Sequence, residues 1–157
     1  MVSSWRYAWQ HGVGPVLPGA GLTALKEALE KDSPELWQPN IKSLDGINTT
    51  IPFLRRCRVR QACAIEYCGW KGEGLKTQGE LWDYCADICE RAEELAGPFA
   101  DDAFTWWFCT TPRDEMRRLL LPEVNRELAR RVETGKPASR VRLKRRTVKS
   151  VRQLVAC

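Results

Sequence analysis

The chain has 157 residues, a hydrophobic fraction of 43% and a formal net charge of +5 at pH 7. This length fits one domain with an extension, and no apolar run approaches the roughly 18 residues of a membrane span. The first residues, MVSSWRYAWQHG, lack the long apolar stretch of a secretory signal, so we expect an intracellular protein.

The N-terminal part predicts a short helix and then a loop. Trp5 and Trp9 are four residues apart, which favours a helix that opens near Ser4 and places both indoles on one face. Residues 11–21, HGVGPVLPGAG, hold four glycines and two prolines. Both residue types interrupt regular structure, so this segment is predicted to be a loop.

A second helix is expected before residue 31. Its apolar stripe consists of Leu22, Leu25 and Leu29. Ser33 and Pro34 resemble a cap with proline in the first turn, so residues 35–37 are predicted to form a helical turn. Residues 38–50 are expected to be a polar loop.

Residues 51–70 permit two interpretations. As a strand, the segment alternates, with Val59 on one face and Arg56, Arg58 and Arg60 on the other. As a helix, it begins at Pro52, and its length exceeds that of a typical strand. We therefore expect a helix, with residues 69–74 as a flexible connector. Four arginines would oppose the dipole at its N-terminal end, which marks them as candidate functional residues: Arg55, Arg56, Arg58 and Arg60.

The clearest element runs from Thr77 to Pro98. Thr77 and Glu80 have the spacing of a capping box, and Gly97 stands where a left-handed helix end is expected. One face carries an apolar stripe at helical spacing, formed by Leu81, Cys85, Ile88, Ala92 and Leu95. We predict an amphipathic helix against which the other segments pack.

Two more helices are expected after Pro98. The first covers the aromatic residues from Phe104 to Phe108, predicted to pack on that stripe, with an exposed docking surface for a partner protein as the alternative. The second begins after Pro112, is kinked or broken at Pro122 and ends at Gly135. Its outer surface is expected to carry five arginines: Arg117, Arg118, Arg126, Arg130 and Arg131.

Seven cysteines raise the question of a metal site. An odd number without a signal peptide argues against a disulfide framework. Four thiolates would suit a structural zinc ion, supplied by Cys63, Cys68, Cys85 and Cys89. The usual two-residue spacing is absent from both pairs, and a cysteine on an apolar helix face behaves as a small hydrophobe. We expect buried thiols, and no metal or cofactor.

Catalytic patterns are weak. His11 is the single histidine, in the predicted loop. The acidic pairs Glu93-Glu94 and Asp101-Asp102 occupy adjacent positions, whose side chains do not converge on a helix. The sequence therefore predicts that the protein is not an enzyme.

Charge is distributed unevenly along the chain. Residues 1–112 carry a net charge of −4 and residues 113–157 one of +9, and residues 136–157 contain eight basic residues and no acidic one. Such clusters neutralise phosphates and release counterions, and a solvated tail is the alternative. The candidate nucleic-acid-binding residues are Arg140, Arg142, Lys144, Arg145, Arg146, Lys149 and Arg152.

These observations predict a mostly α, compact, single domain of about five or six helices over residues 1–135, followed by a basic C-terminal tail over residues 136–157. We expect a non-enzymatic nucleic-acid-binding or regulatory protein that contacts the RNA or DNA backbone, nuclear if its host is eukaryotic. The alternatives are an adaptor that docks a partner protein through aromatic surface, or a zinc module. Richness in Trp, Cys and Arg is similar to that of small viral regulatory proteins, without residue assignments.

Overall fold

The helix predicted from the capping box is α6 (Gln78–Ala96) in the computed structural model, which describes residues 4–39 and 52–135. The Glu80 backbone N–H donates to Thr77 Oγ1, and the Glu80 carboxylate accepts from the Thr77 N–H at 2.9 Å. Four residues of the predicted stripe are buried. The assignment of Leu95 to it is wrong, because the last turn of α6 passes beyond the core and leaves this side chain 59% exposed. Gly97 has positive φ but extended ψ, so it does not form the predicted left-handed end.

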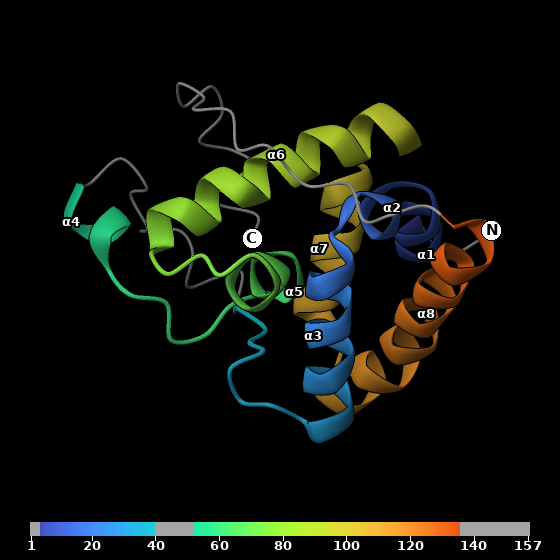
Figure 1. The fold of residues 1–157 in the computed structure, drawn as a ribbon, viewed down its shortest axis with the longest axis horizontal. Coiled ribbons are helices and arrows are strands. Elements are labelled where there is room, and N and C mark those ends of the chain that lie inside the picture. The colour runs from blue at the N-terminus through green and yellow to red at the C-terminus, as the bar shows by residue number, and fades with distance from the viewer. Residues whose placement is uncertain (1–3, 40–51, 136–157) are drawn as a thin grey trace.

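The mostly α, compact, multi-helix architecture is confirmed. Helix α6 crosses one side of the molecule and packs on α7, whereas α3 packs on α8 and η3 (Figure 1). The part of the chain that the structure describes contains these elements: α1 (Ser4–Ala8), η1 (Trp9–Val13, a π-helix), α2 (Gly14–Val16), α3 (Gly19–Lys31), α4 (Pro52–Arg56), α5 (Ala64–Tyr67), η3 (Cys68–Gly72, a π-helix), α6, α7 (Ala100–Thr110) and α8 (Arg113–Thr134).

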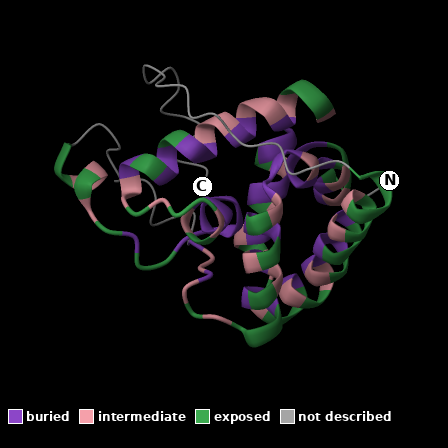
Figure 2. Ribbon diagram, viewed as in Figure 1, coloured by how far each residue is buried: buried purple, intermediate pink, exposed green. Residues whose placement is uncertain are grey.

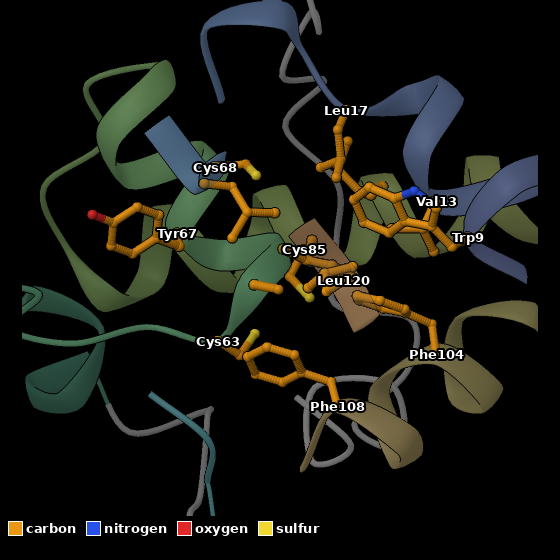
Figure 3. Packing of buried hydrophobic residues seen from close by; sticks show 14 of the residues in the cluster. Trp9, Val13, Leu17, Cys63, Tyr67, Cys68, Cys85, Phe104, Phe108 and Leu120 are labelled. Carbon is orange, nitrogen blue, oxygen red and sulfur yellow. The ribbon is translucent and has the colours of Figure 1, made fainter. Parts of the chain in front are cut away.

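One core joins segments that lie far apart in the sequence. Trp9 from η1, Cys85 from α6, Phe104 from α7 and Leu120 from α8 converge on it (Figure 3). Buried residues follow the inward side of each helix, and exposed residues follow the outward side (Figure 2). The amphipathic patterns of the sequence are therefore satisfied by helix-on-helix packing.

The predicted loop over residues 11–21 is wrong, since η1, α2 and the first turn of α3 occupy this segment. Pro15 stands in the first turn of α2, a position where the missing N–H costs nothing. The glycines serve close packing, because a Cβ on Gly12 would lie 3.0 Å from the Ala96 Cβ. The composition typical of loops here permits short helices to touch.

The predicted helix over residues 51–70 is also wrong. It is divided into α4, an extended stretch over residues 57–63, and α5 continued by η3. The extended stretch is held by isolated bridges, Arg58 to Thr77 and Leu36 to Ala62. The second bridge replaces the helical turn predicted over residues 35–37. Tertiary pairing has overridden the local helical pattern here.

The connector predicted over residues 69–74 belongs largely to η3, which packs tightly on α3. A Cβ on Gly72 would lie 2.4 Å from both Cα and N of Gly21, and a Cβ on Gly21 would lie 2.7 Å from the Cys68 Cβ. The backbones of α3 and η3 therefore approach more closely than any larger residue permits.

The aromatic segment forms α7, as predicted, with Phe104 and Phe108 buried. Trp107 stacks on Trp5 of α1 with ring centroids 3.6 Å apart, whereas Trp106 is 63% exposed. The prediction of a buried aromatic cluster is thus right for most of these side chains. The exposed indole belongs to the alternative interpretation.

The sequence predicted a kink or a break at Pro122, and the break does not occur, because α8 continues through this residue as one helix. Pro122 lies on the exposed side of the helix, while the flanking Leu120 and Val124 are fully buried. Packing on both sides holds the helix together across the proline. It ends at Gly135, whose φ of 62° is left-handed, as the sequence predicted.

Candidate functional site

The arginines of the segment 55–60 lie at the end of the molecule where α4 stands beside the first turns of α6 (Figure 1). The candidate residues of the tail, from Arg140 to Arg152, and the predicted loop over 40–50 are outside the described residues. The described part of the candidate nucleic-acid interface therefore consists of Arg55, Arg56, Arg58 and Arg60.

Extended backbone places two of these arginines on one side. The Val59 N–H donates to the Lys76 carbonyl at 3.1 Å, and Val59 is buried at 8% exposure. Side chains alternate along an extended chain, so Arg58 and Arg60 point away from the core, and both are exposed. The strand pattern, which the sequence offered as the second interpretation, predicted this separation correctly.

Arg55 is committed to the fold. Its Nη2 donates to both carboxylate oxygens of Asp83, at 2.8 and 2.7 Å, and to the Gly79 carbonyl at 3.3 Å. This fork joins α4 to the first turns of α6 and neutralises the arginine. Arg55 is therefore removed from the candidate interface.

The remaining cations form what we call the basic edge: Arg56, Arg58 and Arg60, together with the exposed ring of Phe53. Phe53 precedes Arg56 by three positions on α4, so the two lie on one helix face, and the ring is 72% exposed. Within residues 4–39 and 52–135, no ion pair engages these three arginines. Exposed cations beside an exposed ring are the elements of a single-strand nucleic-acid surface.

The arginines of α8 have a different role from the solvated one that the sequence suggested. Arg131 Nε donates to the Glu127 carboxylate at 2.8 Å, and its Nη2 donates to the carbonyls of Gly14 and Leu17 at 2.9 and 2.6 Å. Arg130 binds the same carboxylate through two nitrogens. These guanidinium groups hold the pKa of Glu127 below its usual value against the effect of burial, which alone would raise it.

The start of α8 is joined to the end of α3 in the same manner. Arg113 donates to Asp32 at 2.7 Å and to the carbonyls of Ser33 and Leu36. Arg117 donates to the Leu29 carbonyl at 2.9 Å. The hydrogen bond and charge of Arg113 lower the pKa of Asp32. Arg117 thus caps C-terminal carbonyls of α3, which lack helical partners, and Arg113 binds the segment that follows this helix.

A third cluster joins α1 to the middle of α8. The buried carboxylate of Glu123 pairs with Arg6 at 3.0 Å and Arg126 at 2.7 Å, and it accepts from Gln10 at 2.8 Å. Of the five arginines expected to cover α8, Arg118 is exposed and makes no hydrogen bond or ion pair with another described residue. Most arginine charge of the helical domain is thus used internally.

The four candidate zinc ligands are all buried. Cys85 and Cys89 bring their sulfurs within 3.9 Å of each other on α6. Over the described ranges, no group of three or more His, Cys, Asp or Glu is arranged to hold a metal ion. Burial raises the pKa of the Cys68 thiol well above its usual value. The sulfur therefore stays protonated, and a protonated thiol is a poor metal ligand.

An apolar groove of about 320 Å³ lies at the opposite end of α6. It is lined by α1, the end of α6 and the start of α7: Ser4, Tyr7, Ala8, Ala96, Pro98, Phe99, Ala100 and Ala103. Sequence reasoning missed this groove, since nothing in a pattern of aromatic residues tells a core ring from a rim ring. The 19 residues of α6 separate it from the basic edge by roughly 28 Å.

Three carboxyl groups among the described residues have raised pKa values: Glu66, Asp101 and Asp102. Burial raises the pKa of Glu66 to about 7, although the Cys63 N–H donates to it. Burial and a hydrogen bond shared with Glu93 raise the pKa of Asp101 to about 6. The single histidine, His11, packs its ring on Tyr7 with centroids 4.5 Å apart.

Comparisons with protein-family models, curated proteins and solved structures find no match to this chain. None of the helices in the described part of the chain combines the length and apolar character that a bilayer span requires. The function is therefore inferred from the chemistry of the residues in this chain.

Proposed function

We propose that the protein binds single-stranded or double-stranded nucleic acid without acting as an enzyme. The observation that carries this proposal is the division of its arginines. Arg55 and five of the six arginines of α8 have carboxylate or carbonyl partners inside the domain, with the exposed Arg118 as the exception. Arg56, Arg58 and Arg60 are exposed within one short segment and have no ion-pair partner among the described residues. Desolvated arginines that stabilise the fold need no other role, but three exposed cations in a row suit a phosphate backbone.

The neighbouring ring supports this assignment. Phe53 is a large apolar side chain in contact with solvent, next to the cations of the basic edge. Bases stack on such rings irrespective of their sequence. A surface that combines both features favours backbone contact and stacking over reading of base edges.

The basic tail is the second half of the proposed interface. It contributes eight positive charges, and removing residues 136–157 would change the net charge from +5 to −3. Arginine binds phosphate bidentately and also stacks on bases. The tail supplies most of the affinity, and the basic edge supplies a fixed anchor on the folded domain.

The test is fluorescence anisotropy with a labelled oligonucleotide across a salt series. Replacement of the three arginines of the basic edge by glutamine should weaken binding and lower the slope of log affinity against log salt by about two to three. Replacing Arg142, Lys144, Arg145 and Arg146 by glutamine should have a larger effect of the same kind.

The matched control is the triple variant Lys26→Gln, Lys31→Gln and Arg118→Gln. It removes the same three charges from α3 and α8, away from the basic edge. We expect its slope to stay within the error of the unmodified protein. An equal loss in the control would mean that net charge alone determines binding, and the basic edge would lose its assignment.

The adaptor alternative has one structural argument, the exposed indole of Trp106 on α7. The two functions differ in a purified system, because nucleic-acid binding needs no further protein. If the intact chain fails to bind RNA or DNA at low salt, docking of a partner protein becomes the preferred function.

A further inference from the structure

The groove at the end of α6 has two exposed aromatic rings on its rim, those of Phe99 and Tyr7. Phe99 adopts a left-handed backbone, with φ of 67°, and leaves its ring 70% exposed. This conformation is strained for a bulky residue and natural for glycine. Such an outlier, together with exposure of the ring, points from structure to function. On the facing wall, Tyr7 of α1 is also about half exposed.

Negative charge lies on one side of this groove. Residues 93–102, which join the end of α6 to the start of α7, contain four acidic residues and no basic one. Arg91 lies 4.0 Å from Asp87. The ion pairs among the described residues leave Glu93, Glu94 and Asp102 without a cation.

The acidic cluster at the α6–α7 junction includes one buried carboxyl group, that of Asp101. Asp101 is 2% exposed, and its Oδ1 has no hydrogen-bond partner among the described residues. Its pKa is raised by burial first and by its shared hydrogen bond with Glu93. Asp101 follows directly after the groove residues Phe99 and Ala100, so a cation placed at the rim would relieve this potential.

We propose that the chain's own C-terminal tail, residues 136–157, docks on this groove within the same molecule. The tail has the complementary charge, with eight basic residues and no acidic one, and it carries apolar residues between them: Val141, Leu143, Val148, Val151, Leu154 and Val155. Its apolar side chains would occupy the space between Tyr7 and Phe99, and its cations would meet the acidic rim.

The place where the described chain ends agrees with this occupant. The last turns of α8 are held against the N-terminal elements by the bonds of Arg131 to Gly14 and Leu17, and α1 of that same region forms one wall of the groove. An extended chain of 22 residues reaches roughly 70 Å, which is more than the length of the path from the end of α8 to the groove. Tethering also raises the effective concentration of the tail at the groove.

The inference does not depend on the proposed function, since docking needs no nucleic acid. Docking has one consequence for nucleic-acid binding, because the cations of the tail cannot neutralise phosphates and carboxylates at once. Docking would therefore reduce the affinity of the tail for a polyanion and suppress binding to weak sites.

The experiment is carbodiimide cross-linking of the full chain at low salt, without nucleic acid, followed by mass spectrometry of monomeric protein. This reagent joins a lysine to a carboxylate in direct contact. We expect links from Lys144 or Lys149 to Glu94 or Asp102, and their loss at about 1 M salt, where screening acts over only about 3 Å.

The variant Phe99→Gly removes the ring and relieves the left-handed strain, so the fold survives. It should lower the yield of these links roughly tenfold, the contribution expected of one aromatic anchor. Trp106→Ala removes another exposed ring, one that does not line the groove, and is the control that should leave the yield unchanged.

Three results would overturn the proposal. They are the absence of tail links to the α6–α7 acids, an equal yield in Phe99→Gly, and links confined to cross-linked dimers. The last result would assign the groove to the tail of a second copy. A thermal melt of each variant ensures that a lost link does not report unfolding.

Discussion

Replacing Gly72 by alanine should destabilise the domain, although alanine is the better helix former. The new Cβ would lie 2.4 Å from Cα and N of Gly21, where ordinary contacts are 3.4–4 Å. Backbone atoms cannot rotate away, so α3 and η3 must separate by about 1 Å. Overpacking costs about 1–3 kcal/mol, and the upper end applies here because the atoms in contact belong to the backbone. The higher helix propensity of alanine returns up to about 1 kcal/mol. We expect a net loss of about 2 kcal/mol.

Urea denaturation followed by circular dichroism measures this change. A loss of about 2 kcal/mol corresponds to a decrease of roughly 4–8 °C in melting temperature for a chain of this size. Gly74→Ala is the matched control, because its position has positive φ of 72° and open space around it. It should lose about 1 kcal/mol through backbone strain alone. If Gly72→Ala is as stable as the unmodified protein, the close approach of α3 and η3 is refuted.

Three further perturbations test the core and its charges. Ile88→Asp places an unpartnered carboxylate at a fully buried position and should abolish the cooperative thermal transition. Arg131→Gln should cost about 3 kcal/mol in urea denaturation because it removes the buried ion pair and three carbonyl contacts, whereas the exposed Arg130→Gln should cost about 1 kcal/mol or less. Burial raises the pKa of Asp101 to about 6 and that of Glu66 to about 7. A carboxyl group with a raised pKa in the folded state stabilises the fold only while it is protonated. The melting temperature should therefore fall as pH rises from 5 through 7. Asp101→Asn should flatten that profile, and an unchanged profile would mean that Asp101 does not titrate in this range.

The sequence predicted the elements whose signals are local. The Thr77 and Glu80 capping box depends on residues three positions apart, and the burial of Ile88 follows from helical spacing. The predictions failed where distant contacts decide. Gly21 appears as a loop residue until Gly72 is placed against it, and the extended backbone at Val59 depends on its pairing with Lys76.

The candidate site was predictable in composition and unpredictable in membership. A run of arginines identified the segment, but only the position of Asp83 shows that Arg55 is neutralised. The same applies to Arg131, whose partners Gly14 and Leu17 are more than 100 positions away in sequence. Which arginine is available to a ligand is a tertiary property, because it depends on where the carboxylates and helix ends lie.

The number of available cations limits the salt dependence of nucleic-acid binding. If the interface consists of the three cations of the basic edge and the eight of the tail, the slope of log affinity against log salt on duplex DNA should not exceed about ten, since each phosphate contact contributes about 0.9. Docking of the tail on the acidic groove lowers this value, because cations that leave carboxylates for phosphates release fewer counterions from the complex. Phe99→Gly should then steepen the slope while the basic-edge variant reduces it. A slope well above ten would mean that further cations contact phosphates. The exposed Arg118 of α8 is available for this, whereas the arginines paired with Glu123 and Glu127 would first have to leave buried carboxylates, which lowers the net gain from each new contact.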